Sequence, residues 1–116
     1  MNSLATAPMK RGDVWWVAFE PALGSEVRKT RPAVIVSNDS ANLHLARVVV
    51  IPMTSNTERV YPGETLVDVG GAQSKVMSDQ IMAADKSRLK TLIGRLSRVD
   101  MRRVESALSL HLGLPR

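Results

Sequence analysis

Residues Arg47-Val48-Val49-Val50-Ile51-Pro52-Met53-Thr54 contain the longest apolar run of the chain, from Val48 to Ile51. A run of this length is typical of a strand that is buried on both faces. It is much shorter than the roughly 20 apolar residues that a membrane-spanning helix requires. We therefore expect residues 47–54 to form a central strand of a sheet, and we expect no membrane span in the chain.

Two strands are predicted before this stretch. Residues 14–19 form the first, and its neighbours Trp15 and Trp16 must face opposite sides of the sheet because strand side chains alternate. One ring should lie in the core and the other at an edge or an interface. Residues 32–37 form the second strand, with a proline tolerated at its first position. A loop over residues 20–31 joins the two strands, and residues 38–42 form a turn or short helical connection.

The chain after residue 54 is predicted to change from strands to a helix. Residues 64–69 alternate polar and apolar side chains, as a half-exposed strand does, and residues 75–82 form a bent strand or a strand pair. Residues 85–89 form a short helical turn capped by Asp85. Ser97 then caps the terminal helix, with Asp100 in place of the usual Glu of a capping box. One face of this helix is apolar, and Gly113 ends it; the face carries Met101, Val104, Leu108 and Leu112.

This order of elements predicts a mainly β fold with a C-terminal helix (α+β), in which a small, strongly bent sheet packs against the helix. The 116 residues suffice for one domain. We assign residues 1–9 to a flexible N-terminal tail and residues 10–116 to a single domain. The N-terminus lacks the basic start and apolar block of a secretory signal, and the chain has no cysteine, which fits a cytoplasmic protein.

The composition of the chain limits the partners and the kinds of site that we expect. A net charge of +5 favours anionic partners such as nucleic acid or an acidic peptide. The only histidines, His44 and His111, have no spaced partners, so we expect no metal site and no cofactor. The scarcity of aromatic residues argues against a single-strand binder that works only by stacking.

One rim of the predicted sheet concentrates groups that suit phosphate. Arg31 directly precedes a strand that should be buried, so its planar guanidinium is anchored at the rim. Thr54 and Ser55 place hydroxyl groups at the end of the strand over residues 47–54. If the two strands pair as a meander, Arg31 and Thr54 face each other. Arg28 and Lys29 add charge in the preceding loop.

At this point the sequence resembles the MazF/PemK toxins of bacterial toxin–antitoxin pairs. The resemblance extends over nearly all residues from Lys10 onward. The matching blocks are Lys10-Arg11-Gly12-Asp13-Val14-Trp15-Trp16-Val17, Gly24-Ser25-Glu26, Arg31-Pro32-Ala33-Val34-Ile35-Val36, Ile51-Pro52-Met53-Thr54-Ser55, Asp79-Gln80-Ile81, Asp85-Lys86-Ser87-Arg88-Leu89 and Leu112-Gly113-Leu114. In combination these blocks are specific, whereas any one of them alone would be a weak signal.

The resemblance implies a small SH3-like, CcdB-like β-barrel and a homodimer. It implies metal-independent, sequence-specific cleavage of single-stranded RNA that leaves a 2′,3′-cyclic phosphate and inhibits translation, and neutralisation by an acidic antitoxin. Carried over by motif, the catalytic residues are Arg31, Thr54 and Glu26. We further predict RNA contacts at Ser25, Arg28, Lys29, Asn38, Ser55, Gln80 and Arg88. A non-catalytic gyrase poison of the CcdB type and a basic nucleic-acid-binding module remain as alternatives.

Overall fold

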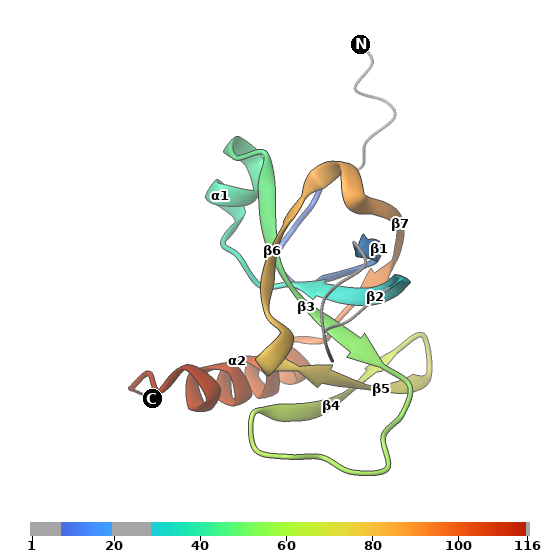
Figure 1. Ribbon diagram of the computed structural model, residues 1–116, viewed down its shortest axis with the longest axis vertical. Helices are drawn as coiled ribbons and strands as arrows, with labels where there is room; N and C mark the ends of the chain where they lie inside the picture. The colour runs from blue at the N-terminus through green and yellow to red at the C-terminus, as the bar shows by residue number, and fades with distance from the viewer. Residues whose placement is uncertain (1–7, 20–28, 116) are drawn as a thin grey trace.

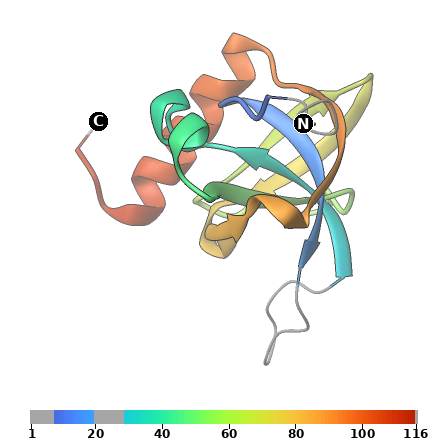
Figure 2. The ribbon, with the colours of Figure 1, turned by 90° about the horizontal axis from the view of Figure 1, so that it is seen from above.

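The computed structural model describes residues 8–19 and 29–115, which form a bent antiparallel sheet with a long helix against it (Figure 1). Figure 2 shows this helix, α2, running along one side of the sheet. In chain order, the elements are β1 (Asp13–Phe19), β2 (Lys29–Ile35), α1 (Asp39–His44), β3 (Arg47–Thr54), β4 (Glu64–Val69), β5 (Ala72–Met77), the 3₁₀ turn η2 (Ser78–Gln80), β6 (Met82–Asp85), the 3₁₀ turn η3 (Lys86–Arg88), β7 (Leu89–Arg95) and α2 (Arg98–Leu112).

The strands follow the order β4-β5-β3-β2-β1-β7, with β6 added to β3 outside this order. β3 changes partner along its length: residues 47–50 pair with β6, whereas Met53 and Thr54 pair with β5. The edge strands β4 and β7 approach each other, since a Cβ built on Gly94 would lie 3.5 Å from Val69 Cγ1. In the described residues, however, no ladder joins them. The predicted mainly β fold with a C-terminal helix is confirmed, while the sheet stays open instead of closing into a barrel.

Apolar side chains are buried on both faces of the sheet. Ile51 belongs to a cluster that includes Met101 and Val104 of α2, whereas Val50 belongs to a second cluster on the opposite face. Both strand residues are fully buried, so the prediction that residues 47–54 are covered on both sides is confirmed. Each fully buried residue of this kind contributes about 1.5–3 kcal/mol of hydrophobic stabilisation. β3 is therefore the strand that ties the two clusters together.

The two neighbouring tryptophans separate as the alternation of strand side chains predicts. Trp15 is 5% exposed and packs in the second cluster, whereas Trp16 is 41% exposed. Trp16 lies opposite Pro32 of β2 on one side and Thr91 of β7 on the other. One ring is thus part of the core, and the other is exposed on the opposite face of the sheet.

Both ends of α2 agree with the sequence prediction. The Asp100 backbone N–H donates to Ser97 Oγ at 3.0 Å, and Gly113 ends the helix with a left-handed φ of 70°. The Asp100 carboxylate does not complete a capping box. It is buried and accepts the Asp68 backbone N–H of β4 at 2.9 Å. The same residue that opens the helix therefore attaches it to the sheet.

Two differences from the sequence prediction concern the strands. β2 begins at Lys29 and ends at Ile35, whereas residues 32–37 were expected. β7 was not predicted as a strand. Residues 1–7 of the expected tail lie outside the described residues, and Met9 at its end packs against the second core cluster. Within residues 8–19 and 29–115, no helix is long and apolar enough to cross a membrane.

Candidate active site

A row of opposed residues crosses the sheet at the end where β3 stops. Arg31 of β2 lies opposite Val17 of β1. The ladder between β2 and β3 ends with Ala33 opposite Pro52, and Arg31 and Thr54 each lie two residues beyond this pair, at the same end of the two strands. Thr54 in turn pairs with Lys75 of β5. Since opposed residues of antiparallel strands share a face, the side chains of Arg31, Thr54 and Lys75 belong to one face of the sheet.

Arg31 is held at its base and available at its tip. Its residue is half-buried, next to the buried Ala33 on the same face and opposite the buried Val17. Within the part of the chain that the structure describes, its guanidinium makes no hydrogen bond or ion pair. An anchored guanidinium with free N–H groups presents a fork that fits two oxygens of a phosphate.

The hydroxyl group of Thr54 is oriented by the turn that follows it. The Asn56 backbone N–H donates to Thr54 Oγ1 at 3.2 Å. A hydroxyl has one proton to donate and two lone pairs that accept, so this bond leaves the Thr54 proton for an outside acceptor. The preceding residue, Met53, is 1% exposed, which fixes the end of β3. Arg31 and Thr54 therefore supply two preorganised donors on neighbouring strands.

The first residue of β2 is a predicted site residue. Lys29 is exposed and has a φ of 66°, a left-handed conformation that is uncommon for a residue other than glycine. It begins β2, two residues before Arg31. The predicted positions Ser25, Glu26 and Arg28 lie outside the described residues, so their roles stay predictions.

Arg88 belongs to the same end of the sheet as Arg31. Its Nη1 donates to the Ala18 carbonyl at 3.2 Å, and Ala18 pairs with Thr30, the neighbour of Arg31. The turn η3 that carries Arg88 is capped by Asp85. The Ser87 backbone N–H donates to the Asp85 carboxylate at 2.9 Å and lowers the pKa of that carboxyl group.

The other predicted RNA contacts are spread out. Ser55 is exposed and directly follows Thr54. Asn38 lies beyond the opposite end of β2, where its side-chain oxygen accepts the Ala41 N–H at 2.8 Å and caps α1. Gln80 lies in η2, after β5 has run back along β3 from its pair with Thr54. The structure thus brings Ser55 and Arg88 to the end that carries Arg31, but places Asn38 and Gln80 elsewhere.

Sequence reasoning did not find Lys75, the third polar member of the row. It is a single lysine in an ordinary strand segment, without a motif or a neighbouring charge that would single it out. Only the strand register places it beside Thr54.

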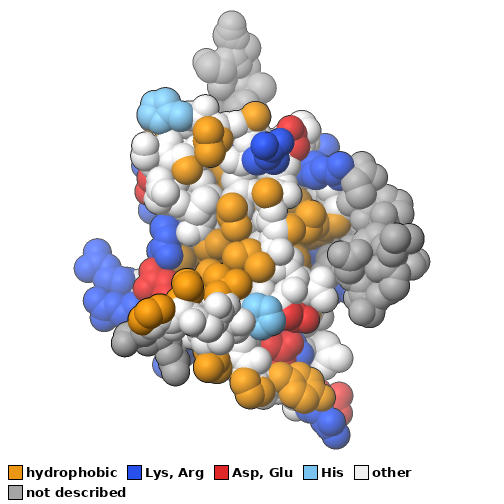
Figure 3. Space-filling view, turned by 60° about the vertical axis from the view of Figure 1, so that its left-hand side comes forward, with side chains coloured by type: hydrophobic (Ala, Val, Ile, Leu, Met, Phe, Trp, Pro, Cys, Tyr) orange, Lys and Arg blue, Asp and Glu red, His pale blue; other side chains and the backbone are white. Residues whose placement is uncertain are grey.

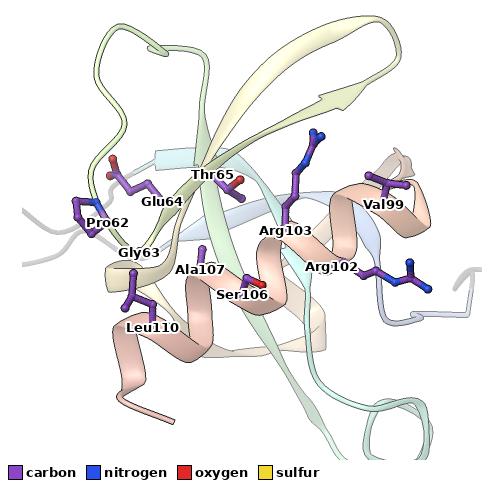
Figure 4. Close-up of a pocket in the computed structure, with 10 residues that line it drawn as sticks. All are labelled: Pro62, Gly63, Glu64, Thr65, Val99, Arg102, Arg103, Ser106, Ala107 and Leu110. Carbon is purple, nitrogen blue, oxygen red and sulfur yellow. The ribbon is translucent and has the colours of Figure 1, made fainter. Parts of the chain in front are cut away.

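A groove of about 490 Å³ lies between α2 and the start of β4 (Figure 4). Its lining combines apolar side chains such as Val99 and Leu110 with Arg102 and Arg103. Because α2 packs on the first core cluster, this groove lies on the opposite face from Arg31 and Thr54. On the side turned forward in Figure 3, further exposed apolar side chains gather at the centre.

Within the described ranges, no three His, Asp or Glu side chains gather to hold a metal ion.

Comparison with known proteins identifies relatives over almost the full chain. The model for the "PemK-like, MazF-like toxin of type II toxin-antitoxin system" matches residues 10–112. The Endoribonuclease MazF9 of Mycobacterium tuberculosis is 41% identical over 115 residues, which cover 91% of this chain and 98% of that protein. The Endoribonuclease MazF of Staphylococcus saprophyticus is 33% identical over 112 residues, which cover 91% of this chain and 92% of that protein.

A solved structure from the same comparison has the same fold. It is a mycobacterial endoribonuclease in complex with its cognate antitoxin. The superposition has a TM-score of 0.76 at 30% identity, and it covers 92% of this chain and 97% of that one.

Proposed function

This chain belongs to the PemK-like, MazF-like toxin family of type II toxin–antitoxin systems, and we propose that it is an endoribonuclease that cuts RNA beside Arg31 and Thr54. The observation that carries the proposal is the register that sets these two donors on adjacent strands of one face. Pure binding of a partner does not require an anchored guanidinium beside an oriented hydroxyl, which weakens the reading as a non-catalytic gyrase poison.

The proposed reaction is an internal transfer within the RNA. The ribose 2′-oxygen attacks the adjacent phosphorus, the new O2′–P bond forms, and the P–O5′ bond breaks. The products are a 2′,3′-cyclic phosphate and a 5′-hydroxyl. Negative charge grows on the non-bridging oxygens during the attack, and preorganised donors aimed at those oxygens lower the barrier. Arg31 serves as the main donor, and Thr54 donates its hydroxyl proton to the phosphate.

The 2′-hydroxyl must also lose its proton, and the leaving 5′-oxygen must gain one. Arginine stays protonated in proteins, so Arg31 is unsuited to accept a proton. We assign the acceptor role to Glu26, the carboxylate of the Gly24-Ser25-Glu26 block, and solvent water supplies the proton that the leaving 5′-oxygen takes up. No step of this scheme needs a metal ion, because the guanidinium supplies the positive charge.

The RNA is single-stranded in this proposal, because unpaired bases expose the edges that a protein can read. Ser55, Lys29 and Arg88 lie at the end of the sheet that carries Arg31 and are suited to contact the strand near the cut. Ser25 and Arg28 are assigned to the same task from the sequence, and Asn38 and Gln80 to more distant nucleotides. These contacts determine which bases can flank the cut, and they therefore define the sequence specificity of cleavage.

The partners of the chain follow from the same family membership. The mycobacterial relative is bound to its cognate antitoxin, and the net charge of +5 suits an acidic antitoxin here. Exposed apolar side chains such as Leu110 and Leu112 favour assembly into a homodimer. We place the activity in the cytoplasm, where cleavage of mRNA stops translation.

The experiment that tests this function is incubation of the purified chain with a long RNA, followed by sequencing of the product ends. We expect cuts at a recurring sequence, with 2′,3′-cyclic phosphate and 5′-hydroxyl ends, that persist when EDTA is added. The variant Arg31→Ala should make no cuts while it unfolds at the same temperature as the wild type. Arg102→Ala, on the exposed surface of α2, is the matched control and should cut normally.

Two results would contradict the proposal. Salt-sensitive binding of RNA without products would fit a binding module instead. Loss of cleavage in EDTA would refute the metal-free scheme.

A further inference from the structure

Lys75 is a buried lysine that the proposed reaction does not use. It is 9% exposed, although lysine is among the residues least often buried. An ammonium group removed from water is costly unless it is paired and hydrogen-bonded. Other groups must therefore compensate the charge of Lys75 at its position opposite Thr54.

The compensating groups come from the segment between β3 and β4. Lys75 Nζ donates to the Arg59 carbonyl at 2.9 Å and lies 3.4 Å from Glu64 Oε1. The same Glu64 oxygen accepts the Tyr61 backbone N–H at 2.8 Å. Figure 4 shows the Glu64 side chain pointing away from α2, on the side of the β3–β4 segment. We call this arrangement of Lys75 and Glu64 the clasp.

The clasp fixes the segment that begins directly after Thr54. Residues 55–63 leave the end of β3 and return to β4 (Figure 1). The Glu64 N–H donates to the Tyr61 carbonyl at 2.9 Å and closes the return turn. Since Lys75 pairs with Thr54 and also holds the Arg59 carbonyl, the segment is folded back to within one lysine side chain of the end of β3.

The segment presents groups that suit an unpaired nucleotide. Tyr61 is 55% exposed, and Arg59 Nη1 donates to its hydroxyl oxygen at 3.4 Å. Aromatic rings and guanidinium planes are surfaces on which unpaired bases stack. A ring on an unrestrained segment would lose part of this contact energy to the ordering of the segment on binding.

We propose that Lys75 and Glu64 are positioning residues, which hold the β3–β4 segment beside Thr54 as a wall that contacts the nucleotides next to the scissile phosphate. The inference rests on the proposed endoribonuclease function and adds to it the residues that fix one side of the RNA site. The clasp affects the binding of the RNA strand. It does not position Thr54, because Thr54 is held by β3 and by its buried neighbour Met53.

The kinetic test compares Lys75→Met, which keeps the aliphatic stem, with Lys75→Arg and Glu64→Gln. The substrate is an oligonucleotide that contains the sequence mapped for the wild type. We expect Lys75→Met to raise KM by about tenfold or more with kcat within about threefold, as loss of uniform binding does. Lys75→Arg should restore most of the KM. Lys90→Met is the matched control, because Lys90 Nζ also bonds a backbone carbonyl, that of Ser87, but away from the segment.

A second measurement does not depend on RNA. Trypsin cuts after arginine, and the carbonyl of the Arg59–Val60 bond is the one that Lys75 holds. Initial tryptic cleavage at this bond, followed by mass spectrometry, should be faster in Lys75→Met than in the wild type and in Lys90→Met. The folded fraction of each variant is measured by thermal unfolding.

The outcomes separate the claims. Unchanged KM in Lys75→Met overturns the positioning role. A lower kcat in proportion to the folded fraction, at constant KM, also overturns it, because Lys75 would then only stabilise the fold. A wild-type chain that cuts no RNA refutes the endoribonuclease function itself and the role of the clasp with it, whereas the tryptic rates still report whether Lys75 holds the segment.

Discussion

Thr54 combines a strand and a turn in one residue. Its backbone belongs to β3, while its side-chain oxygen accepts the N–H of Asn56, two residues later. The hydroxyl proton is not used in this bond and stays available for an acceptor outside the turn. A donor oriented before the substrate arrives needs no reorganisation during the reaction.

Replacing Thr54 by valine should test this donor, because valine has nearly the same shape without the hydroxyl. We expect kcat to fall about 100- to 1,000-fold, the usual effect of removing one oriented donor to a growing oxyanion. Thr54→Ser should keep most of the activity. The measurement is single-turnover cleavage of the mapped RNA sequence.

Thr91→Val is the control for this substitution, since Thr91 is an exposed threonine of β7 outside the row. A Thr54→Val variant that cuts as fast as Thr91→Val would show that the hydroxyl has no part in the chemistry.

Among the elements, α2 has one buried carboxylate that forms a hydrogen bond to the sheet. Asp100 accepts the Asp68 backbone N–H at 2.9 Å and lies 3.3 Å from Arg103 Nη1. Its backbone N–H is used separately, by the Ser97 cap. Capping and docking of the helix are thus two different functions of one residue.

The two functions predict different costs. Asp100→Ala should lower the free energy of unfolding by about 1–3 kcal/mol, because the partly buried Asp68 N–H loses its partner. Ser97→Ala should cost about 1 kcal/mol through the lost cap. Urea unfolding at neutral pH measures both.

Ser106→Ala, exposed on the same helix, should change stability by less than about 0.5 kcal/mol. If Asp100→Ala proved as harmless as this control, the hydrogen bond from Asp68 would contribute nothing to the attachment of α2.

The elements differ in how well their sequences predict them. β3 and α2 were predictable because a consecutive apolar run and a capped apolar face are local signals. β7 was not, because only Leu89 of its seven residues is buried and the strand is defined by its ladder with β1. The residues of the candidate site also differ in how well the sequence predicts their positions. The proximity of Arg31 and Thr54 follows from an antiparallel meander, whereas the place of Lys75 depends on a partner switch of β3 that no local pattern reveals.

At the scale of the whole molecule, net charge acts on every encounter with RNA. The chain carries +5, and the cations Arg31 and Lys29 lie at the end of the sheet proposed to meet the RNA. Each phosphate that a cation neutralises releases bound counterions, so binding weakens as salt rises.

We therefore expect a steep salt dependence of cleavage. For roughly three neutralised phosphates on a single strand, affinity should fall roughly 15- to 20-fold between 50 and 200 mM salt. The effect should appear in KM, with kcat little changed. Initial rates over a salt series measure this slope, and a flat series would exclude a phosphate-based RNA site.

The ladder between β1 and β7 has a consequence for how the chain folds. Arg95 Nε donates to Asp13 Oδ1 at 3.0 Å across a separation of 82 residues. Contacts between such distant residues require closure of a long loop, and they slow folding relative to local contacts. A ribosome that makes this protein must release the chain through β7 before the first strand can meet this partner. The complete sheet therefore forms only after β7 has emerged.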